Sequence, residues 1–138
     1  MKGHYRTDIP LYSPVVFHLV ITPDIKGAHR TLGVKFKKSC AWSGGEVHTK
    51  RHDIYCILQE GCVTHDWIGH ELYHAVDAVY EIVGIEAGTD LSEVGARIAG
   101  FLHDWVYKTL KRHGVRVSFI PHDLPEVPEE VDNAKVVV

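Results

Sequence analysis

Two long stretches of the chain repeat apolar residues with the period of an α-helix. In the first, residues 65 to 84, the apolar positions form one stripe: Ile68, Leu72, Ala75, Val79 and Ile82. Thr64 is a suitable N-cap for this helix, and Gly84 is a suitable end. In the second, which runs from about Asp90 to Lys111 or Arg112, the stripe consists of Leu91, Val94, Ile98, Phe101, Leu102 and Trp105. The pattern therefore predicts two main helices.

Four shorter stretches have the composition or the alternation of β-strands. Residues 15 to 21 and 53 to 59 are rich in β-branched and aromatic residues, as buried strands are. Residues 31 to 38 and 115 to 120 alternate apolar with polar residues, which favours strands with one face in water. Residues 39 to 51 carry Gly44, Gly45 and mixed charges, which predicts a loop. The expected fold is α+β, with a small twisted sheet of three to four strands packed on the two main helices.

Length and composition limit the classes of protein that the chain can belong to. A chain of 138 residues fits a single domain, here over 1–124, followed by an extended tail over 125–138. The net charge of −3 does not favour nucleic acid as a partner. No apolar run is long enough to cross a membrane, and the N-terminus lacks the apolar core of a secretion signal, so a cytoplasmic location is expected. The pattern does not indicate an oligomeric state.

The first predicted helix carries the motif HExxH, as His70-Glu71-Leu72-Tyr73-His74. Residues four apart lie on one face of a helix, so His70 and His74 can direct two imidazole nitrogens at one cation. Glu71 can flank the ion without binding it and take a proton from water that the metal activates. The alternative is that these residues form only the hydrated face of an amphipathic helix.

A hydrolytic zinc site needs a third protein ligand, and Glu93 at the start of the second helix is the preferred candidate. The turn between two helices can bring Glu93 back beside the two histidines. The other candidates for the third ligand are Asp77, Glu81, Glu86, Asp90 and Cys62. Glu93 also has a purely structural explanation, because Asp90-Leu91-Ser92-Glu93 has the spacing of a capping box.

The motif, together with Glu93-Val94-Gly95-Ala96 on the next helix, resembles the gluzincin clan of zinc metallopeptidases in a small, minimal form. The resemblance covers about residues 52 to 107, and it implies a zincin-like domain that holds Zn²⁺ through His70, His74 and Glu93. It also implies Glu71 as general base and a strand before the metal helix that lines the substrate cleft. The candidates for stabilising the oxyanion are His103, Tyr107 and His113. Arg97 stands where thermolysin-like members have an acidic residue.

The expected function is therefore zinc-dependent hydrolysis of peptide bonds in a peptide or protein substrate that adds as a strand along residues 53 to 59. One alternative is a zinc-binding interaction or assembly protein without catalysis, because a small chain offers little cleft wall. Another is a metal-free α+β binding module. By analogy, a compact chain without a signal sequence suits a phage product.

Overall fold

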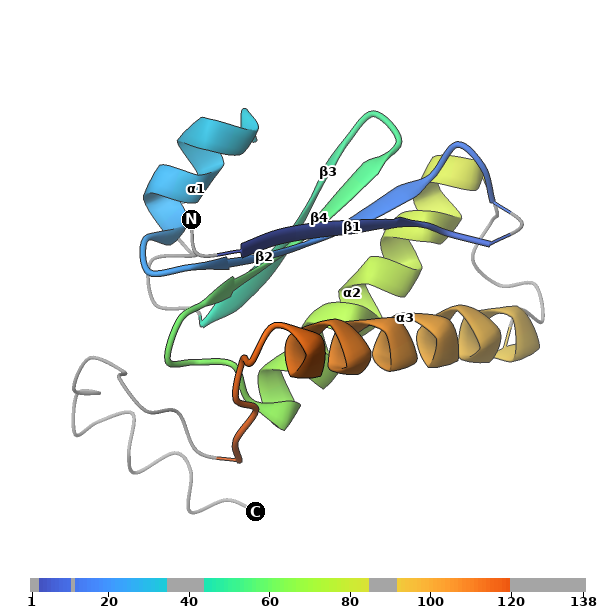
Figure 1. The fold of residues 1–138 in the computed structure, drawn as a ribbon. Coiled ribbons are helices and arrows are strands. Elements are labelled where there is room, and N and C mark those ends of the chain that lie inside the picture. Colours follow the sequence, from blue (N-terminus) through green and yellow to red (C-terminus); the bar gives the residue numbers. More distant parts are fainter. Residues whose placement is uncertain (1–2, 11, 35–43, 85–91, 120–138) are drawn as a thin grey trace, which may run out of the picture.

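The computed structural model describes residues 3–10, 12–34, 44–84 and 92–119. They form four strands and three helices, and the fold is α+β as expected (Figure 1). The strands are β1 (Gly3–Asp8), β2 (Val16–Thr22), β3 (Gly45–Lys50) and β4 (Asp53–Gln59). The helices are α1 (Ile25–Leu32), α2 (His65–Val83) and α3 (Ser92–Arg112). Among the described residues, no helix is both long and apolar enough to cross a membrane.

The four strands make one mixed sheet in the order β1-β2-β4-β3. β2 and β4 pair in parallel at the centre, and β1 and β3 flank them as antiparallel edge strands. The central strands are buried along almost their whole length, which explains their nearly continuous apolar sequence. The predictions for 15 to 21 and 53 to 59 are therefore confirmed, and the second coincides with β4.

The two faces of the sheet are covered unequally (Figure 1). α2 and α3 pack against one face and enclose the main core, while the short helix α1 lies over the other face. Alternate residues of the central strands supply the two cores. The main core includes Phe17, Leu19, Ile54, Leu58, Ile68, Leu72, Leu102 and Leu110, and the smaller core beneath α1 consists of Val20, Ile25, Ala28, Tyr55 and Ile57.

The ends of α2 agree with the sequence-based prediction. The Thr64 side chain accepts a hydrogen bond from Trp67 N at 3.1 Å, which is the interaction of an N-cap. Gly84 ends the helix with φ 75°, a left-handed conformation that glycine adopts without steric cost. The small residue Gly95 lets α3 approach α2 closely, because a Cβ there would lie 2.5 Å from the Tyr80 Oη.

Several predictions about shorter elements are wrong. Residues 45–50 form β3 although they fall in the predicted loop, and β1 and α1 were not expected. Thr31 and Leu32 belong to α1 and not to a strand, and residues 35–38 of that predicted strand lie outside the described residues. In the predicted strand 115 to 120, the described residues form a single bridge, between Ser118 and Thr64.

The position of the edge strand also differs from the expectation. β4 pairs with β2 on one side and β3 on the other, so a substrate cannot add along residues 53 to 59. The edge of the sheet beside α2 is β3. β3 approaches α2 closely at Gly45, where a Cβ would lie 2.7 Å from Leu58 Cδ2 and 3.3 Å from Glu71 Cγ.

The substitution Gly45→Ala tests this close approach. We expect it to lower the free energy of unfolding by about 1–3 kcal/mol, because the added methyl group meets packed side chains. Gly69→Ala is the matched control, since Gly69 lies within α2 and a Cβ there would have no neighbouring atom within 4 Å. It is expected to raise the stability by about 0.5–1 kcal/mol through helix propensity. Chemical denaturation measures both values, and an unchanged midpoint for Gly45→Ala would contradict the packing.

Leu72 and Tyr73 test which face of α2 meets the core. Leu72 is buried, whereas Tyr73 is 69% exposed. Leu72→Ala is expected to cost about 2–5 kcal/mol of stability, because it removes buried methyl groups and leaves a cavity. Tyr73→Ala is expected to change stability by less than about 0.5 kcal/mol. Equal losses in thermal unfolding would show that the orientation of α2 is different.

Candidate metal sites

His70 and His74 lie side by side on the exposed face of α2. Their Nε2 atoms are 3.2 Å apart, and the two ring planes are inclined at 69°. Two nitrogen ligands of a tetrahedral zinc ion, each about 2.0–2.1 Å from the metal, are separated by roughly 3.3 Å. The structure therefore brings the two predicted histidines together at a spacing that suits two ligands of one ion.

Glu71 lies one residue further round the helix and is buried, with 3% of its surface exposed. Its Oε1 is 3.9 Å from His70 Nε2, so the carboxylate reaches from beneath β3 toward the histidine pair. Burial raises the pKa of Glu71 to about 7, with an opposing contribution from His70 and a further increase from Glu46. A carboxyl group with a pKa near neutrality can both accept and return a proton.

Glu93 is the second residue of α3, and its carboxylate is turned toward its own helix. Its side chain is 77% exposed, and its Oε1 accepts a hydrogen bond from Arg97 Nε at 3.0 Å. Within the described part of the chain, Glu93 does not join His70 and His74 in a compact group of three ligand atoms. Its role as third ligand therefore stays a prediction.

The other candidates for the third ligand differ in position. Asp77 and Glu81 are exposed further along α2, and Cys62 is buried before the helix begins. Glu86 and Asp90 lie outside the described residues, and so does the Asp90 end of the proposed capping box.

The three candidates for stabilising an oxyanion occupy different places. The Tyr107 hydroxyl is 2.8 Å from His65 Nδ1, at the first residue of α2. His65 precedes His70 by five residues, or about 7.5 Å along the helix axis. His103 Nδ1 donates to the Ala99 carbonyl at 2.7 Å, and His113 stacks on Tyr5 of β1, at a ring separation of 4.2 Å. β1 is the edge strand far from β3, so the structure does not gather the three candidates at one point.

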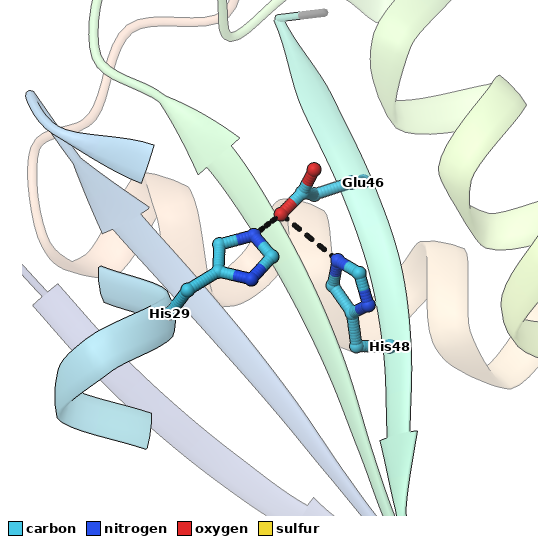
Figure 2. Close-up of side chains that lie close together, drawn as sticks. All are labelled: His29, Glu46 and His48. Atoms are coloured by element: carbon cyan, nitrogen blue, oxygen red, sulfur yellow. Dashed lines mark ion pairs between the residues drawn. The ribbon is translucent and has the colours of Figure 1, made fainter. Parts of the chain in front are cut away.

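A second group of potential ligands, which was not predicted from the sequence, lies on the other side of the sheet. His29 comes from α1, while Glu46 and His48 come from β3. Both imidazole Nε2 atoms are directed at Glu46 Oε1, from His48 at 2.9 Å and from His29 in direct contact (Figure 2). The ligand atoms all lie within 4.8 Å of one another, so this group could hold a metal ion.

The sequence does contain a signal for this second group. Ile25, Ala28, His29 and Leu32 follow the spacing of a helical face, and Gly33 ends that helix in a left-handed conformation with φ 70°. Glu46 and His48 are two residues apart, which places both on one face of a strand. Neither element was expected, so neither pattern could be connected with the other.

Comparison with known proteins adds no family to this geometry. The chain matches no protein-family model, and no curated protein or solved structure matches it significantly.

Proposed function

We propose that the protein is a zinc-dependent metallopeptidase whose site is built around His70, Glu71 and His74. One observation carries this proposal. The Nε2 atoms of the two exposed histidines are 3.2 Å apart, and the buried carboxylate of Glu71 lies beside them. A hydrated amphipathic face would not require a buried glutamate between two convergent histidines.

In this proposal, His70 and His74 supply two ligands to Zn²⁺, and Glu93 supplies the third. When bound, zinc would polarise the scissile carbonyl and lower the pKa of water. Glu71 takes a proton from the attacking water and passes it to the leaving amine. The side chain of Glu71 is buried where α2 faces β3. Its carboxylate therefore needs little reorganisation to accept a proton.

β3 offers the surface along which an extended peptide can bind. Among the described strands it is the outer one beside α2, and a peptide that pairs with it would pass next to the histidine pair. Such pairing uses backbone hydrogen bonds and therefore selects for an extended conformation more than for a particular sequence. A peptide or an exposed protein segment is accordingly the proposed substrate.

The second candidate function is zinc binding without catalysis, in an interaction or assembly protein. The observation that favours it is that, among the described residues, no third ligand atom joins His70 and His74 in a compact group, and Glu93 accepts a hydrogen bond from Arg97 instead. Peptide cleavage distinguishes the two functions, since only a peptidase turns over substrate.

Glu71→Gln tests the role of the buried carboxylate. The variant is expected to keep the zinc ion and to lose roughly 10²–10⁴-fold in peptide cleavage, because the amide cannot accept the proton. Asp66→Asn is the control, since Asp66 is exposed on the same helix and is not one of the candidate ligands. Cleavage of a fluorogenic peptide library and the zinc content of both variants give the answer. Undiminished cleavage by Glu71→Gln would remove Glu71 from the mechanism.

Glu93→Gln and Arg97→Gln test the third ligand as a pair. The first is expected to lower the affinity for the zinc ion at His70 and His74. The loss should exceed the roughly 10–100-fold that is typical when a residue that only orients a metal ligand is removed. The second releases Glu93 from its ion pair and is expected to leave zinc affinity equal or higher. Competition with a chromophoric chelator measures both affinities. If Glu93→Gln binds zinc normally, Glu86→Gln and Asp90→Asn identify the ligand instead.

A further inference from the structure

We propose that His29, Glu46 and His48 form a second zinc site, separate from the HExxH pair, that fastens α1 to the edge strand β3. The two sites lie on opposite faces of the sheet. Glu46 and His48 pair across the strands with Ile57 and Tyr55, which face α1, whereas Gly45 and Val47 pair with Leu58 and Cys56, which face α2. This inference therefore stands independently of the proposed peptidase.

The geometry of the group suits three ligands of one ion. His29 and His48 direct their Nε2 atoms at the same carboxylate oxygen, and their ring centroids are 4.5 Å apart at an interplanar angle of 76°. In Figure 2 the three side chains enter from α1 and from β3 and meet at one point. Zinc bonds of about 2.0–2.2 Å place ligand atoms roughly 3.3–3.5 Å apart. The ligand atoms of this group all lie within 4.8 Å of one another, so they are already gathered around one point.

Burial and charge also favour a cation. The exposed fractions of the side chains are 2% for His29, 6% for Glu46 and 14% for His48. A carboxylate that is removed from water needs a compensating positive charge nearby. A divalent ion bound to all three groups would provide such a charge.

The donor set indicates the kind of ion, and its burial indicates the role. Two imidazoles and one carboxylate are a ligand set that zinc uses, and this set also occurs with non-haem iron. Substrates have little access to the group, because its members are almost buried. We therefore assign zinc with a structural role.

A structural ion has a clear task at this position. α1 contains eight residues, which is too short for a stable isolated helix, and the core beneath it is small. A bond from His29 to the metal would fix α1 against β3. It would also fix the strand that lies against Glu71 at Gly45.

Zinc stoichiometry in two double variants tests this inference. The cluster variant is His29→Gln/His48→Gln, and the helix variant is His70→Gln/His74→Gln. The wild type is expected to hold two zinc ions per chain, each double variant one, and their combination none. His52→Gln is the matched control, because His52 is exposed in the turn after β3, and it is expected to keep both ions. Elemental mass spectrometry after removal of loosely bound metal measures the content.

The two proposals fail in distinguishable ways. If the helix variant has the same zinc content as the wild type, the proposed zinc site at His70 and His74 is overturned. The proposed site at His29, Glu46 and His48 is not affected by that result. If the cluster variant has the same zinc content as the wild type, the second site is wrong. Iron in place of zinc in protein from cells supplied with both metals would overturn the choice of metal.

A second measurement covers the case in which the cluster variant does not fold. Zinc added to the metal-free helix variant is expected to raise its Tm by roughly 10 °C or more at a thousandfold excess over Kd. X-ray absorption of zinc in this variant is expected to show two imidazoles and a carboxylate oxygen. Sulfur ligands, or no change in Tm, would overturn the inference.

Discussion

The close contact between β3 and α2 is the constraint on which both candidate sites depend. Gly45 has no side chain to separate the strand from the helix, so Glu71 is covered by the backbone of β3. Side chains alternate along a strand, so the same register that turns Gly45 and Val47 toward α2 turns Glu46 and His48 toward α1. One edge strand thus shapes the surroundings of the HExxH glutamate and supplies two members of the second cluster.

This arrangement places two buried carboxylates on opposite sides of a single strand. Glu71 and Glu46 are both almost fully buried, and the negative charge of Glu46 contributes to the raised pKa of Glu71. A cation near Glu46 would oppose that contribution, since it would offset the charge that Glu71 experiences. The two sites are therefore coupled electrostatically even though the sheet separates them.

The sequence predicted the elements that have a strong period or a continuous apolar run. These elements are α2, α3, β2 and β4. The pairing of His70 with His74 was predicted as well, because their spacing places them on one helical face. β3 was missed because Gly45 and its charged residues resemble a loop locally, and only pairing with β4 makes it a strand. The cluster of His29 with Glu46 and His48 depends on contact between two such elements, so spacing along the chain could not reveal it.

The Glu93–Arg97 ion pair is weak compared with the binding of a zinc ion. The pair is exposed and has an i,i+4 spacing, and such pairs contribute only about 0.3–0.5 kcal/mol. Binding of structural zinc releases on the order of 10–16 kcal/mol in small zinc-binding peptides. Breaking the pair therefore costs little compared with the free energy of binding a zinc ion. If His70 and His74 hold an ion, Glu93 can join them when its side chain reaches them from the first turn of α3, and the ion pair with Arg97 is too weak to prevent it.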